Sequence, residues 1–148
     1  MSILKSILGG RKIDQRDTNR LIFDLAEHGN RPADLQELYR RLPSMELFGK
    51  VSDANFPFDD GARHVVRPGE ILKLQSASIP GGHCLVQFFT NRTDPRLRPR
   101  YIGILSRDAC EMVLKMDGFD GLMLCNPSDS WIALLKPELE RLLRRELA

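Results

Sequence analysis

The chain has 148 residues, a length typical of a single domain. Hydrophobic residues make up 42% and charged residues 28% of it, an ordinary globular composition that argues against disordered, collagen-like and coiled-coil proteins. The 22 Lys and Arg residues are balanced by 20 Asp and Glu residues, which argues against a dedicated nucleic-acid-binding protein, and no apolar run approaches the ~18 residues that a membrane helix needs.

The first residues resemble a flexible leader more than an export signal. Residues 1–16 show only weak apolar spacing, and residues 1–10 are too short and too polar for a secretory signal. Cysteine is present in an odd number without a CxxC pair, and each cysteine lies in an apolar run, so we expect reduced and buried thiols at Cys84, Cys110 and Cys125. The sequence therefore predicts a cytoplasmic protein with one domain over residues 17–148.

The first third of that domain predicts a helical hairpin. A helix is expected from Thr18, as N-cap, to about Glu27, and Gly29 with Asn30 ends it. Pro32 suits the first turn of a second helix, which Pro43 ends. Apolar residues recur at helical spacing in both segments, at Leu21, Ile22 and Leu25 and then at Leu35, Leu38, Tyr39 and Leu42.

The remaining sequence mixes strands with two further helices. Strands are predicted over residues 45–51, 71–79, 84–90, 101–105, 122–125 and 131–135. A helix over residues 106–116 has Ser106 as its expected N-cap, and Pro137 opens a C-terminal helix. The pattern predicts an α+β fold, in which the N-terminal hairpin and these two helices pack on a mixed sheet of five or six strands.

Three segments resemble the SseB N-terminal-domain family. The strand end Val-Gln-Phe-Phe-Thr-Asn at residues 86–91 is similar to a P-x-F-T-S/D pattern of that family, and residues 120–127, Asp-Gly-Leu-Met-Leu-Cys-Asn-Pro, are similar to its D-G-L-V-I-N-P strand and turn. Leu135, Glu138 and Leu139 match the L-x-x-E-x-L pattern of its last helix. The resemblance covers about residues 32–143. It implies a bacterial protein related to secretion, without assigned catalytic residues.

Catalytic and metal-binding patterns are weak throughout the sequence. The histidines His28, His64 and His83 lack the i, i+4 spacing of a helix-borne zinc site. The cysteines lie in apolar surroundings, which raise the pKa of a thiol. Asp59 and Asp60 precede Gly61, a pattern more typical of a turn than of a hydrolase, so a hydrolase is the least supported hypothesis. We expect no metal, no cofactor and no enzymatic activity.

Two segments remain as candidate binding surfaces. Five arginines fall within sixteen residues and could grip carboxylates or phosphates: Arg92, Arg96, Arg98, Arg100 and Arg107. The long connection 52–70 carries apolar residues among acidic ones, and loops on a rigid scaffold often bind partners. Because aromatic and Arg residues dominate binding hot spots, we expect partner contacts at Phe56, Phe58, Arg96, Arg98 and Arg100.

The sequence thus predicts a non-enzymatic protein-binding domain that holds or neutralises a dedicated bacterial partner, either a secretion component or a toxin. The alternative is a small-molecule or anion-binding domain that uses the arginines of residues 92–107. Asn126, followed by Pro127 at the end of a buried strand, is expected to be structural, with its amide bonded to backbone groups.

Overall fold

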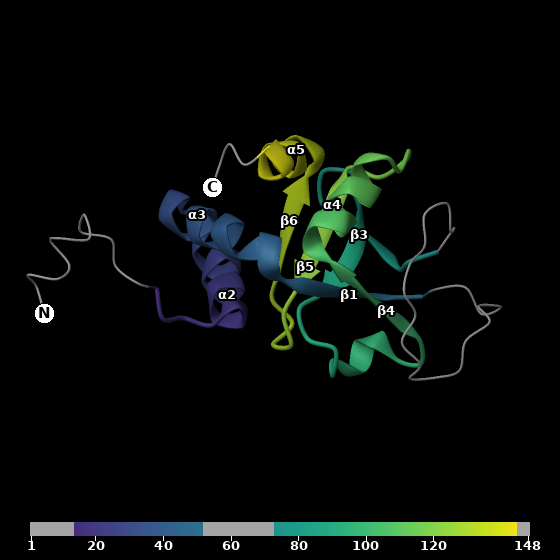
Figure 1. Ribbon diagram of the computed structural model, residues 1–148, viewed down its shortest axis with the longest axis horizontal. Helices are drawn as coiled ribbons and strands as arrows, with labels where there is room; N and C mark the ends of the chain where they lie inside the picture. The colour runs from purple at the N-terminus through teal and green to yellow at the C-terminus, as the bar shows by residue number, and fades with distance from the viewer. Residues whose placement is uncertain (1–13, 52–72, 145–148) are drawn as a thin grey trace, which may run out of the picture.

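The computed structural model describes residues 14–51 and 73–144 (Figure 1). This part of the chain forms α-helices α2 (Thr18–His28), α3 (Pro32–Arg41), α4 (Ser106–Leu114) and α5 (Lys136–Arg144), and the short 3-10 helices η1 (Leu42–Ser44) and η2 (Pro95–Leu97). Its strands are β1 (Glu46–Lys50), β2 (Ser76–Ile79), β3 (His83–Phe89), β4 (Tyr101–Leu105), β5 (Gly121–Cys125) and β6 (Trp131–Leu135). The predicted α+β class, with a mixed sheet and a helical hairpin, is confirmed.

The six strands form one sheet in the order β4-β1-β3-β5-β6, and β2 pairs with β3 off this path. The central strands β3 and β5 are parallel, with Leu85 opposite Gly121, while the other strand pairs are antiparallel. Helix α4 lies between β4 and β5 in the sequence and contacts both strands, as expected for the crossover that a parallel pair needs. The outermost strands of this order are β4 and β6.

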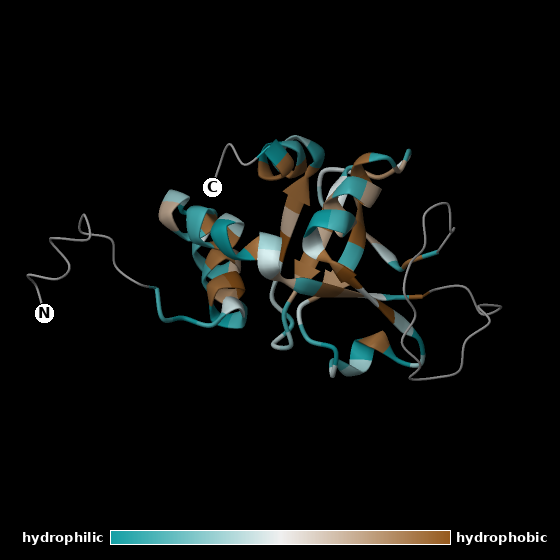
Figure 2. Cartoon of the chain, viewed as in Figure 1, coloured by the Kyte–Doolittle hydropathy of each residue, from teal (hydrophilic) through white to brown (hydrophobic). Residues whose placement is uncertain are grey.

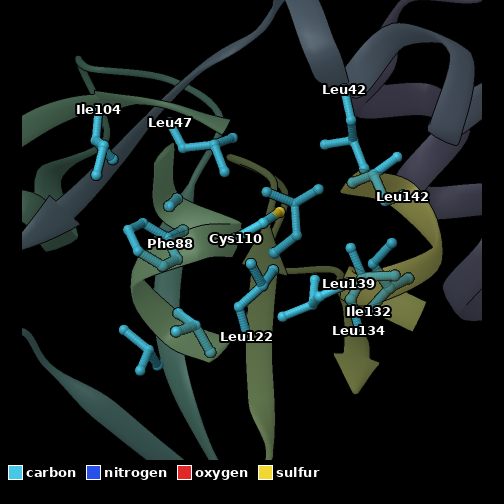
Figure 3. Close-up of a cluster of buried hydrophobic side chains, with 14 of the residues drawn as sticks. Leu42, Leu47, Phe88, Ile104, Cys110, Leu122, Ile132, Leu134, Leu139 and Leu142 are labelled. Atoms are coloured by element: carbon cyan, nitrogen blue, oxygen red, sulfur yellow. The ribbon is translucent and has the colours of Figure 1, made fainter. Parts of the chain in front are cut away.

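Alternation along the strands divides the core into two clusters. The larger cluster joins one face of the sheet to all four described α-helices, and Figure 3 shows Leu47, Phe88 and Leu122 of the strands pointing toward Cys110, Leu139 and Leu142 of the helices. The smaller cluster lies on the opposite face and holds Phe48, Leu85, Phe89, Leu97, Met123 and Cys125. In Figure 2 the strands are mainly brown, whereas the helices carry both colours, as amphipathic helices do.

Two helix starts differ from the prediction. The cap of α2 is Asp17, whose carboxylate accepts a hydrogen bond from the Arg20 amide at 2.7 Å, and Thr18 is already helical. Ser106 does not cap α4 either, because its buried hydroxyl donates a hydrogen bond to the carbonyl of Leu42 in η1. Ser106 therefore joins the start of α4 to η1, the 3-10 helix that follows the N-terminal hairpin.

Residues 14–16, predicted as part of a flexible leader, are tied to the helical hairpin. The guanidinium of Arg16 contacts Asp14 at 2.5 Å, Asp24 of α2 at 2.9 Å and Asp34 of α3 at 2.8 Å. The hydrogen bond from Arg16 is the main reason why the pKa of Asp14 falls to about 2. A single cation thus connects the segment before α2 to both helices of the hairpin.

Within residues 14–51 and 73–144, no helix is long and apolar enough to cross a membrane.

Candidate protein-binding surface

Arg96, predicted as a partner contact, bonds other groups of its own chain. Its Nε and Nη2 donate to the two carboxylate oxygens of Asp94 at 3.0 and 2.7 Å, and Nη2 also donates to the carbonyl of Asn126 at 2.6 Å. Nη1 donates to Asp129 at 2.8 Å, and the guanidinium lies 4.8 Å from the centre of the Phe89 ring. Asp94 is only 3% exposed, and a buried carboxylate needs a cation to compensate its charge. Arg96 is that cation.

This arrangement fixes the segment between β3 and β4 to the sheet. The hydrogen bonds from Arg96 hold the pKa of Asp94 below its ordinary value, even though burial acts in the opposite direction. Leu97 of η2 follows directly and is fully buried in the smaller cluster, beside the strand residues of that face. The geometry gives Arg96 a structural role, and its predicted contact with a partner stays a prediction.

The other arginines of the segment differ in their surroundings. Arg98 is exposed, with its guanidinium 5.9 Å from the centre of the Tyr101 ring. Arg92 is exposed as well, and Arg100 is half-buried. Arg107 lies on α4 and pairs with Glu111 at 3.7 Å, one helical turn away. Among the predicted contact residues that the structure describes, Arg98 is therefore the one best exposed to another molecule.

Asn126 joins the turn between β5 and β6 to helix α2. Its Nδ2 donates to the carbonyl of Asn19 at 2.8 Å, and its Oδ1 accepts from the amides of Ser128 at 3.0 Å and Ser130 at 2.9 Å. The side chain is 1% exposed, whereas Pro127 is exposed. The amide of Asn126 thus bonds backbone groups, as the sequence predicts. The contribution of these bonds to stability stays a prediction.

Two large apolar side chains are exposed on the outermost strands. Leu105 of β4 is 55% exposed and Trp131 of β6 is 40% exposed. Their neighbours Ile104 and Ile132 belong to the larger cluster, so Leu105 and Trp131 point toward the opposite face, where the smaller cluster lies. Sequence reasoning missed both as surface residues, because their strands are apolar almost throughout and conceal the alternation.

The three cysteines all lie in the described part of the chain, where their burial can be compared with the prediction. All three cysteines are free, and Cys110 and Cys125 are buried as predicted, but Cys84 is only half-buried. Burial raises the pKa of Cys110 to about 12 and also raises the pKa of Cys125. In the described ranges, no group of three or more His, Cys, Asp and Glu side chains could hold a metal ion.

The predicted contacts Phe56 and Phe58, the two aspartates of the hydrolase hypothesis and one of the three histidines lie outside the described residues. Phe56, Phe58, Asp59, Asp60 and His64 all belong to residues 52–72.

Comparisons with protein-family models, curated proteins and solved structures give no significant match for this chain.

Proposed function

We propose that this chain is a non-enzymatic protein-binding domain, resembling SseB N-terminal domains, that holds or neutralises a secretion component or a toxin in the bacterial cytoplasm. The observation that carries the proposal is the exposure of Leu105 (55%) and Trp131 (40%) on the two outermost strands. Large apolar groups on a surface lose unfavourable contact with water when a partner covers them.

Arg98 supports the same proposal. It is exposed beside Tyr101, on the strand that also carries Leu105. Tyr and Arg are enriched among the residues that contribute most to binding, whereas isolated surface charges act mainly on association rates. We propose Arg98 as the arginine that contacts the partner, with Arg100 beside it, and Phe56 and Phe58 stay predicted contacts.

The anion-binding alternative has less support from the geometry. An anion site needs several cationic groups that converge on one point, but Arg96 is bonded to Asp94 and Asp129, and Arg107 is paired with Glu111. Arg92 and Arg98 remain exposed, so the alternative now rests mainly on these two side chains.

Affinity purification of the tagged protein from its native cells tests the proposal. We expect one stoichiometric protein partner, whose recovery falls about tenfold with Leu105→Ala, the loss that a desolvated contact residue produces. Arg98→Ala should slow association and reduce its dependence on salt. Lys115→Ala, which removes an exposed cation at the end of α4, serves as the control and should change neither result.

Recovery without any stoichiometric protein partner would contradict the proposal. A co-purified anionic small molecule that is displaced by Arg98→Ala would instead support the anion-binding alternative.

A further inference from the structure

Strand β6 presents unpaired backbone groups at the edge of the sheet. The Asn126 amide bonds the Ser130 carbonyl, and the Lys136 amide bonds the Asp120 carbonyl, so the even-numbered residues of this strand face β5. In an antiparallel pair the residues between them direct their N–H and C=O groups away from the partner strand. Within residues 14–51 and 73–144, β6 pairs only with β5, which leaves the N–H groups of Trp131, Ala133 and Leu135 and the carbonyls of Trp131 and Ala133 unpaired. The carbonyl of Leu135 lies at the start of α5, where it accepts the first hydrogen bond of the helix.

A groove runs beside this edge. A hollow of about 520 Å³ lies between β6 and the C-terminal half of α2, within the roughly 300–1,000 Å³ typical of ligand sites. Helix α2 stands next to β6 at the end of the sheet in Figure 1. Three consecutive strand residues line the hollow, and because consecutive side chains point to opposite faces, the hollow follows the strand's edge. Its lining is Leu25, Ala26, Glu27, Gly29, Asn30, Asp129, Ser130, Trp131, Ile132 and Ala133.

The charge of the groove is one-sided. Its lining includes two carboxylates, those of Glu27 and Asp129, and no Lys, Arg or His. Asp129 shares its charge with Arg96 at 2.8 Å, while Glu27 is exposed on α2. Glu27 therefore supplies the acidic charge of the lining that Arg96 does not offset, and this charge favours a basic ligand.

We propose that the groove between α2 and β6 binds an extended, basic peptide segment of a partner protein, which adds a strand to the sheet beside β6. The outward N–H and C=O groups supply the main-chain hydrogen bonds, and the acidic lining selects Lys or Arg side chains. Trp131 lines the groove, and an aromatic ring attracts a cation that packs against its face. This inference rests on the proposed function and names the kind of segment that the domain recognises.

A second copy of the chain fits the groove less well than a peptide. Each copy carries α2 beside its own β6, so two β6 edges that approached one another would bring both helices into the same space. An isolated extended segment brings no such helix. The occupant we infer is therefore a single strand from a different protein.

Synthetic peptides can test the inference, because Trp131 is the only tryptophan of the chain and reports on the groove by its fluorescence. The probe is the peptide acetyl-Thr-Lys-Val-Lys-Thr-Lys-Val-amide. We expect saturable binding with a change in Trp131 emission, and binding about tenfold weaker for the matched peptide with Glu in place of Lys. N-methylation of two adjacent central residues, which removes backbone donors on both edges of the peptide, should also weaken binding about tenfold.

Two pairs of variants test the same contacts from the protein side. Ala133→Pro removes an outward N–H and leaves the hydrogen bonds to β5 in place, so it should abolish binding of the Lys peptide. Ala133→Val retains this N–H and should still bind the peptide. Glu27→Gln should weaken the Lys peptide several-fold, while Glu111→Gln, on α4, should not. If Ala133→Pro fails to fold, the N-methylated peptide still tests the backbone contact.

Three results would overturn the inference: no saturable binding of the Lys peptide, equal affinity for the Lys and Glu peptides, or full binding of the N-methylated peptide. These outcomes remain distinct from failure of the proposed function. A stoichiometric partner that is lost with Leu105→Ala but does not compete with the Lys peptide would leave the protein-binding function standing and place its contact at β4.

Discussion

The two outermost strands, β4 and β6, present similar backbone edges in different surroundings. On β4, the Val51 amide bonds the Arg100 carbonyl and the Ser106 amide bonds the Met45 carbonyl, so the odd-numbered residues face outward, as they do on β6. Strand β4 carries exposed Leu105 at one end and Tyr101, beside Arg98, at the other, whereas α2 and two carboxylates flank the edge of β6. The two edges therefore differ in that β4 presents exposed side chains, whereas a groove lies beside the outward backbone groups of β6.

The largest expected loss of stability comes from a glycine substitution at the β6 end of the sheet, and the same substitution on β4 should have a much smaller effect. A Cβ at Gly121 would lie 2.7 Å from the Cα of Leu135 and even closer to the carbonyl oxygen of Leu134, so Gly121→Ala must force β5 and β6 apart. We expect a loss of about 3 kcal/mol in unfolding free energy, at the upper end of overpacking costs, measured by urea denaturation.

Gly103→Ala on β4 is the matched control. The nearest atom to its added Cβ is Oε2 of Glu46, at 3.0 Å, the end of a flexible side chain that can move. We expect a cost below about 1 kcal/mol. Equal costs at the two glycines would contradict the description of a tight β5–β6 pair.

A second prediction separates two arginines that are close in sequence. Arg96→Ala leaves the buried carboxylate of Asp94 without its cation and should cost about 2 kcal/mol of unfolding free energy. Arg98→Ala removes an exposed side chain and should change stability by less than about 0.5 kcal/mol. Similar denaturation midpoints for the two variants would refute the structural role of Arg96.

Asn126 joins the turn before β6 to helix α2, so a substitution at Asn126 tests how strongly α2 is held at the β6 end of the sheet. Asn126→Ala should cost about 1–2 kcal/mol, because the carbonyl of Asn19 and the amides of Ser128 and Ser130 lose a buried partner. Asn91→Ala, at the end of β3, loses bonds only to exposed Thr93 and should cost less than about 0.5 kcal/mol. An unchanged denaturation midpoint for Asn126→Ala would contradict the structural role of this residue.

The smallest effect concerns acid stability of the helical hairpin. Arg16 lowers the pKa of Asp14 from 3.8 to about 2, so its stabilising effect is complete above the unfolded value and is lost as the pH falls from about 4 toward 2. Arg16→Met should cost about 1 kcal/mol at pH 7 and much less near pH 2, measured by urea denaturation at both values. A cost that does not change with pH would show that Arg16 acts by packing and not by charge.

Local patterns predicted most of the elements but not how they combine. The strands at 101–105 and 131–135 were predicted with their observed bounds, since alternation and flanking turns are local signals. The parallel pairing of β3 with β5 joins residues as distant as Leu85 and Gly121, and no periodicity records such a contact.

Contacts between residues that are distant in sequence also explain why the candidate site could not be predicted in full. Arg96 and Arg98 look equivalent in sequence, but the guanidinium of Arg96 bonds the carbonyl of Asn126 and the carboxylate of Asp129, which lie 30 and 33 residues further along the chain. The groove likewise combines α2 with β6, from opposite ends of the chain. In both cases contacts between residues that are distant in sequence complete the arrangement, and residue spacing does not reveal such contacts.

Amide hydrogen exchange along β6, followed by NMR, tests the central claim most directly. In the free protein we expect fast exchange at Trp131, Ala133 and Leu135 and slow exchange at Ile132 and Leu134, which bond β5. The Lys peptide should slow exchange at the three outward amides and leave the outward amides of β4 unchanged. Outward β6 amides that are already protected in the free protein, or that remain unprotected when the peptide is bound, would contradict the account.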